Sequence, residues 1–262
     1  MPRRCFRHEL GIMLLLYQIF SLGIDLIPPG TLGLILLQTL VYLNIFPKPW
    51  DTLGVCISAH TILYDREYRR LVLSALEHGD DMHLYYNMVS LIVKGKQLER
   101  MFGIIHYLVL VFFLIVSTSA MYVLLSVISS MINNDESDLY QCAIGFSAVL
   151  FAMKTIMTRL HPNETQQLLN MTVRAVYAPW IELIVIHLMV PNASFKGHLS
   201  GILVGLCYTE TPLRILVHVG GHVVSEILGS ERCKQKKMKL LVDTGGHMLY
   251  WEVEMKIKEQ TM

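Results

Sequence analysis

Charged side chains are scarce in this chain. Asp, Glu, Lys and Arg make up 16% of its 262 residues, against about a quarter in an ordinary soluble domain. The net charge is only +1, and no stretch interleaves basic with aromatic residues, so we expect no nucleic-acid partner. Hydrophobic residues account for 53% and stand in long runs rather than at amphipathic spacing. These features predict a polytopic membrane protein.

Metal-binding and disulfide signatures are also missing. The sequence contains no H-E-x-x-H, which argues against an intramembrane metalloprotease, and we expect neither a metal nor a cofactor. The five cysteines are odd in number, scattered and never spaced as C-x-x-C. They therefore predict neither a disulfide framework nor a zinc site. Their positions are Cys5, Cys56, Cys142, Cys207 and Cys233.

Six apolar segments are predicted to cross the membrane as helices, starting near residues 30, 83, 104, 140, 176 and 195. The last of them is expected to run from Phe195 to about Val217. The connection 47–81 is polar and should form short helices on the bilayer surface, and 161–174 should be a polar loop. The fold class expected is therefore an all-α membrane protein.

The predicted division of the chain has three parts. Residues 1–29 would be a cytosolic N-terminus with an interfacial helix, 30–218 the core of six transmembrane helices, and 219–262 a cytosolic tail. The apolar run 10–26 could instead span the membrane, and the pattern leaves that choice open.

The positive charges predict the orientation of the spans. Arginines before the first span, basic residues at the end of the second and the basic tail all fall on one side, which would be the cytosol. The acidic loop 133–138 falls on the opposite side. Under this count Ser147 and His198 both lie near the non-cytosolic ends of their spans, roughly 5–12 Å below the surface by helical rise.

Ser147 and His198 are the candidate catalytic pair. A serine in a membrane helix often bonds only the backbone carbonyl four residues earlier. Here, however, a histidine stands at the predicted mouth of another span, so the two side chains are the minimum parts of a nucleophile and its base. No carboxylate lies near His198 in sequence, which predicts a dyad rather than a triad.

Small residues around this pair predict close helix packing. Gly201 and Gly205 lie on the same face as His198, and Ala148 and Ala152 are spaced to face them from the serine-bearing span. The same pattern without the histidine would be a generic packing or dimerisation motif. Gly145 fits a tight backbone turn ahead of Ser147.

Three ordered motifs resemble the rhomboid family of intramembrane serine proteases. They are H-x-x-x-N at His83 and Asn87, G-x-S at Gly145 and Ser147, and G-H-x-x-G-x-x-x-G from Gly197 to Gly205. The resemblance covers roughly residues 10–215 and is closest to the branch of the endoplasmic reticulum.

The resemblance implies a six-helix core with a surface-lying first loop, and a Ser147–His198 dyad on its lumenal side. The implied reaction is hydrolysis of a peptide bond in a transmembrane substrate. By the same resemblance, the Ser147 N–H, the His83 ring and the Asn87 amide would bind the oxyanion. The implied partners are transmembrane proteins and the lipid bilayer.

The sequence departs from the family pattern at three places. Ala148 follows the serine where glycine is usual, and Tyr68 replaces the tryptophan of a W-x-R motif that ends at Arg70. We see no tail motif for ubiquitin or for an unfolding ATPase after Gly220.

Two alternative functions come from these observations. A catalytically silent client-binding protein of endoplasmic-reticulum-associated degradation is favoured only by Ala148. A small transporter could use His83, Asn87 and Glu182 to line a path, but no internal repeat supports it.

Overall fold

The structure is a computed structural model that describes residues 10–168, 171–190 and 193–228. By its internal contacts the chain divides into two units, Met1–Gly221 and His222–Met262. The predicted tail, including the basic cluster 232–239, lies almost wholly outside the described residues.

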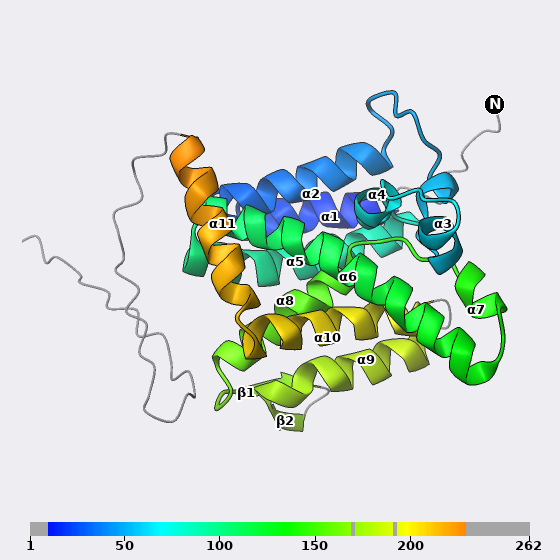
Figure 1. The fold of residues 1–262 in the computed structure, drawn as a ribbon. Coiled ribbons are helices and arrows are strands. Elements are labelled where there is room, and N and C mark those ends of the chain that lie inside the picture. The colour runs from blue at the N-terminus through cyan, green and yellow to red at the C-terminus, as the bar shows by residue number, and fades with distance from the viewer. Residues whose placement is uncertain (1–9, 169–170, 191–192, 229–262) are drawn as a thin grey trace, which may run out of the picture. The chain divides into compact units, whose positions relative to one another are not determined.

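Helices make up most of the described chain (Figure 1). They are α1 (Leu10–Leu22), α2 (Pro29–Tyr42), α3 (Ala59–Leu63), α4 (Arg70–Leu76), α5 (Asp81–Phe102), α6 (Ile104–Asn133), α7 (Ser137–Tyr140), α8 (Ser147–Leu160), α9 (Ala178–Met189), α10 (Phe195–Glu210) and α11 (Leu213–Ile227). Three short 3-10 turns are Ile24–Leu26, Leu53–Val55 and Ala175–Tyr177.

The core is formed where α5, α6, α8 and α10 pack together, and α8 and α10 run side by side (Figure 1). Each of these helices contributes fully buried apolar side chains, for example Leu84, Leu114, Met153 and Ile202. Among the described residues, α6 is the only helix that is by itself long and apolar enough to cross a membrane. The core of six transmembrane helices therefore stays a prediction.

The N-terminal helices α1 and α2 flank α5, one tied to each of its ends. The Gly11 N–H donates to Asp81 Oδ2 at 2.8 Å, so the start of α1 meets the start of α5. At the other end of α5, the Glu99 carboxylate accepts the N–H groups of Gly30 (2.8 Å) and Thr31 (2.6 Å). A carboxylate there satisfies free donors of the α2 N-terminus and complements its partial positive charge. The interfacial position of residues 10–26 stays a prediction.

The predicted short helices of the 47–81 connection are confirmed as α3 and α4. Glu77, which is buried after α4, seats this loop by accepting from Lys48, from Trp50 Nε1 (2.8 Å) and from Thr52 Oγ1 (3.1 Å). Arg70 adds a bond from Nη1 to the Cys56 carbonyl, 2.8 Å long. The loop is thus anchored although Tyr68 stands in place of a tryptophan.

Two predictions about local structure are wrong. The last apolar segment is not one helix to Val217, because α10 ends at Glu210 and α11 continues after a bend of 83°. Thr211 has an extended backbone (φ −123°, ψ 166°), which is the conformation that a following proline imposes, and Pro212 follows it. The loop 161–174 contains an antiparallel hairpin, β1 (Thr165–Leu168) with β2 (Met171–Arg174), so the fold is not purely helical.

Candidate active site

Ser147 is the first residue of α8 and follows a bend, in which Gly145 has φ +114° and Phe146 a helical backbone (φ −81°, ψ −4°). The N–H groups of a first helical turn have no partner within the helix, and the helix dipole adds partial positive charge there. The Ser147 hydroxyl therefore lies at an end of α8 that favours a developing negative charge.

His198 lies in the first turn of α10, directly beside this serine. Its Nε2 is 2.9 Å from Ser147 Oγ, and the residue is only 7% exposed. The imidazole stacks on the Phe151 ring, with 4.7 Å between centroids and 25° between planes. Its Nδ1 is buried and has no hydrogen-bond partner among the residues described. The ring is thus oriented by an aromatic face rather than by a carboxylate.

Close contact between α8 and α10 brings the serine and the histidine together. A Cβ on Gly201 would collide with the Ala148 carbonyl oxygen and come within 2.8 Å of Phe151 Cβ. A Cβ on Gly205 would lie 2.6 Å from Thr155 Cβ and 2.9 Å from the Ala152 oxygen. Glycine at both positions is what lets the two backbones approach this closely.

His83 and Asn87, one turn apart on α5, face the same region. Gly145 has φ +114°, and a Cβ there would lie 2.7 Å from His83 Nε2, so this glycine lies directly against the imidazole. The Asn87 side chain is buried and its Nδ2 donates to the His83 carbonyl at 2.7 Å, leaving its second N–H available. The structure thus places Gly145 against His83, with Asn87 one helical turn further along α5.

His78 is a buried neighbour of this group, and sequence reasoning gave it no role. Its ring meets the His83 ring edge to face at 5.1 Å. Burial, reinforced by the nearby His83, holds the pKa of His78 well below its ordinary value, so the ring is neutral at physiological pH.

Asp138 and Lys196 tie the start of α10 to the segment before α8. Lys196 Nζ lies 2.7 Å from Asp138 Oδ1, and Ser129 (2.6 Å), Asn133 (3.1 Å) and Gln141 (2.7 Å) also donate to that carboxylate. Hydrogen bonds from Lys196, Ser129 and Asn133 lower the pKa of Asp138 to about 2. The opposite charges at positions 138 and 196 were the only sequence signal for this link.

A second charged group links α5, α8 and α9. Glu182 of α9 pairs with Lys154 of α8 and lies 3.7 Å from Lys94 of α5. The transporter alternative uses Glu182 to line a path, whereas in the structure its carboxylate faces two lysines. No cluster of three or more potential metal ligands occurs in the part of the chain that the structure describes.

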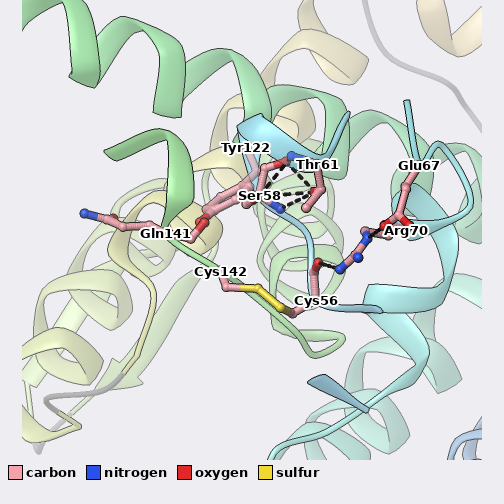
Figure 2. Close-up of a disulfide and its surroundings, with 8 residues drawn as sticks. All are labelled: Cys56, Ser58, Thr61, Glu67, Arg70, Tyr122, Gln141 and Cys142. Atoms are coloured by element: carbon pink, nitrogen blue, oxygen red, sulfur yellow. Dashed lines mark hydrogen bonds and ion pairs between the residues drawn. A yellow bond between two sulfur atoms is a disulfide. The ribbon is translucent and has the colours of Figure 1, made fainter. Parts of the chain in front are cut away.

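The expectation about cysteines is wrong at one pair. Cys56 and Cys142 form a disulfide with Cα atoms 5.6 Å apart (Figure 2). The residues are 86 positions apart, so their spacing carried no signal of pairing. Beside the disulfide, Ile57 and Ala143 exchange two backbone hydrogen bonds of 2.9 Å each.

Comparison with known proteins gives consistent matches. Residues 65–214 match the family described as Rhomboid domain. The chain is 41% identical over 217 residues to Rhomboid-related protein 4 of Mus musculus and 40% identical over 214 residues to that of Homo sapiens, covering 82% of this chain and 67% of each relative. It is 29% identical over 216 residues to Rhomboid-type serine protease 2 of Yarrowia lipolytica, covering 80% of this chain and 68% of that protein.

Proposed function

Because this chain belongs to the rhomboid family, we propose that it is an intramembrane serine endopeptidase that cleaves transmembrane client proteins. Ser147 would be the nucleophile and His198 its base. The observation that carries the proposal is the 2.9 Å separation between His198 Nε2 and Ser147 Oγ at the N-terminus of α8. A nucleophile and a base within hydrogen-bond reach are the minimum requirement for acyl transfer.

The first half-reaction forms an acyl-enzyme. His198 Nε2 accepts the Ser147 hydroxyl proton while Oγ attacks the carbonyl carbon of the scissile bond. The carbonyl oxygen becomes an oxyanion, for which the Ser147 N–H, the His83 ring and the Asn87 amide are the proposed donors. The intermediate collapses as His198 gives its proton to the leaving amine.

The second half-reaction repeats these steps with water as nucleophile. Water gives its proton to His198 and attacks the acyl carbon, and Ser147 leaves with the proton returned. Stacking on Phe151 holds the imidazole in place through both steps, in the absence of a third catalytic residue among those described. The residues present complete the cycle without a cofactor.

The proposed location is the endoplasmic reticulum, with the active site on the lumenal side and a core of six transmembrane helices. The Cys56–Cys142 disulfide supports this orientation, because disulfides persist in oxidising compartments and Cys142 is only five residues from Ser147. The bilayer and transmembrane clients would then be the partners.

The alternative, a silent client-binding protein, is supported by Ala148 in place of glycine. The close approach of His198 to Ser147 favours catalysis over it, since binding alone does not require that contact. Replacing Ala148 with glycine separates the two: an active wild type should hold or gain activity, whereas a protein silenced by this alanine should become active only in the variant.

The test is cleavage of a single-span model client by purified protein in liposomes. Ser147→Ala and His198→Ala should each abolish cleavage, whereas Ser117→Ala should keep wild-type turnover. Ser117 is a matched control because it is a half-buried helical serine on α6, in an apolar pocket with Phe113 and Met121. Cleavage that persists in Ser147→Ala would refute the proposal.

A further inference from the structure

The Cys56–Cys142 disulfide joins the surface loop to the segment that leads into Ser147 (Figure 2). Cys56 lies in the loop before α3, and Cys142 lies between α7 and α8. Beside the disulfide the two segments meet through an isolated backbone bridge, in which Ile57 and Ala143 donate to each other's carbonyls. Next to it, the His60 ring of α3 stacks on the Tyr140 ring of α7 with 4.6 Å between centroids. One bridge of two hydrogen bonds outside any sheet has no neighbouring strand to reinforce it.

The segment from Cys142 to Ser147 leads directly into the proposed oxyanion site. Beyond the bridge at Ala143, the Gly145 N–H donates to the Ser74 carbonyl at 2.8 Å, and Gly145 lies against the His83 imidazole. Ser147 follows two residues later as the first residue of α8. Cys142 and Ser147 are only five residues apart, so a displacement of Cys142 should also displace the Ser147 N–H.

The other end of the disulfide is fixed to the protein. The Cys56 carbonyl accepts a 2.8 Å bond from Arg70 Nη1, and Arg70 also pairs with Glu67. Two residues after Cys56, Ser58 caps α3 by accepting from the Thr61 N–H. On the other side Gln141 and Cys142 are exposed, and the Gln141 carbonyl accepts a 2.9 Å bond from the Tyr122 hydroxyl. The disulfide thus connects an anchored loop to an exposed segment whose backbone is held by the neighbours of Cys142, Gln141 and Ala143.

We propose that this disulfide is a positioning element of the active site, which holds Gly145 and Ser147 in the geometry that binds the oxyanion. The inference rests on the proposed protease function. Its reduction would let the segment 142–147 move relative to His83, lowering turnover while leaving client binding almost unchanged. The pair therefore couples activity to an oxidising environment.

Reduction needs a thiol donor, and exposure of Cys142 lets one reach the bond. A dithiol attacks one sulfur as its thiolate, the Cys56–Cys142 bond breaks, and a mixed disulfide forms. The second thiolate of the dithiol then displaces the protein sulfur. The protein gains two electrons and two protons as two thiols, and the dithiol leaves as a cyclic disulfide.

The experiment titrates the full-length protein in detergent micelles with dithiothreitol and follows three quantities. Maleimide mass tagging counts free thiols, client cleavage gives kcat and KM, and hydrogen exchange reports the amides of 143–147. We expect reduction to add two tags, lower kcat about tenfold with KM within about twofold, and speed exchange at Ala143 and Gly145. A fall of this size is smaller than the ~10²–10³-fold that loss of one oxyanion donor costs, because the donor is displaced rather than deleted.

Matched variants identify the thiols responsible. A Cys56→Ala and Cys142→Ala double variant should have the reduced kcat without dithiothreitol and no further response to it. Cys207→Ser removes the exposed free cysteine of α10 and should respond to dithiothreitol as the wild type does. If the double variant does not fold, the titration of the wild type carries the test alone.

Three results would overturn the inference: no added tags on reduction, two added tags with unchanged kcat, or two added tags with unchanged exchange at 143–147. Failure of the protease function is distinguishable, because the oxidised wild type would then show no cleavage at all. In that case thiol tagging and hydrogen exchange still decide whether the disulfide holds the segment.

Discussion

Gly145 lies directly against His83: a Cβ on the glycine would be 2.7 Å from the imidazole Nε2. The glycine reaches this position with φ +114°, a backbone conformation that side chains with a Cβ rarely adopt. Glycine is therefore required at position 145 for two separate reasons: its positive φ, and the lack of room for a Cβ beside His83.

Gly145→Ala should reduce kcat about 10²-fold, because the methyl group pushes the proposed oxyanion donor His83 out of place. The variant should also lose roughly 1–3 kcal/mol of stability from backbone strain. The matched control is Gly103→Ala, since Gly103 has φ +78° with no atom within 4 Å of its Cβ position. It should lose stability in thermal unfolding but keep kcat. Equal kcat losses in both variants would contradict a specific role of Gly145.

Asn87→Ala should lower kcat about 10²–10³-fold with little change in KM, since an oxyanion donor acts only in the transition state. Asn87→Asp keeps the shape but removes the N–H donors and should be similarly impaired. Steady-state cleavage of a model client measures both. If turnover is unchanged while the unfolding temperature drops, Asn87 serves only to hold the His83 backbone carbonyl.

The Asp138 carboxylate should make the protein sensitive to acid. Its pKa in the folded state, about 2, lies below the ordinary value of 3.8, so its stabilising contribution is complete above about pH 4. That contribution disappears as the pH falls through 4 toward 2, because protonation weakens the bond to Lys196. Thermal unfolding of the wild type in micelles should therefore decline across this range.

Asp138→Asn should lower the unfolding temperature at pH 7 and flatten its dependence on pH between 4 and 2. Asp135→Asn is the matched control: hydrogen bonds from Ser137 lower the pKa of Asp135 too, but these bonds are local to one turn. The Asp135→Asn substitution should lower the unfolding temperature less than Asp138→Asn does. If Asp135→Asn is as unstable as Asp138→Asn, the bond between Asp138 and Lys196 contributes no special stability.

Glu182→Gln should destabilise the packing of α9, because it leaves Lys94 and Lys154 close together without their carboxylate. We expect a loss of about 1–3 kcal/mol, below the ~3–5 kcal/mol that breaking a fully buried pair costs, since the Glu182 side chain is 25% exposed. Adding Lys154→Met should restore about 1 kcal/mol by removing one unpaired charge. Additive losses in the double variant would mean that the two residues do not interact.

The sequence predicted the parts of this structure that depend on local pattern. The apolar runs and the short helices of the 47–81 connection follow from composition and spacing. The placement of His83 and Asn87 on one face of α5 follows from their separation of one helical turn. The small residues of two segments indicated which faces of α8 and α10 would meet. Pro212 also carried a usable signal for the end of α10, which the apolar run concealed.

Features that depend on pairing across long separations were not predictable. Cys56 and Cys142 are far apart in the sequence, and they meet because the folded chain brings Ile57 beside Ala143 and His60 beside Tyr140. The same holds for two ion pairs, Asp138 with Lys196 and Glu182 with Lys154. Their partners are far apart in the sequence and come together only when the helices pack. The hairpin 165–174 has no clear alternation of apolar and polar residues, so it had the composition of a loop.

The central claim, that Ser147 is a nucleophile activated by His198, is tested most directly by a fluorophosphonate probe. The purified full-length protein is labelled in micelles, and mass spectrometry of its peptides locates the phosphonate adduct. We predict an adduct on Ser147 in the wild type and in Ser117→Ala, and no adduct in Ser147→Ala or His198→Ala. An adduct that persists in Ser147→Ala, or a folded wild type that carries none, would contradict the claim.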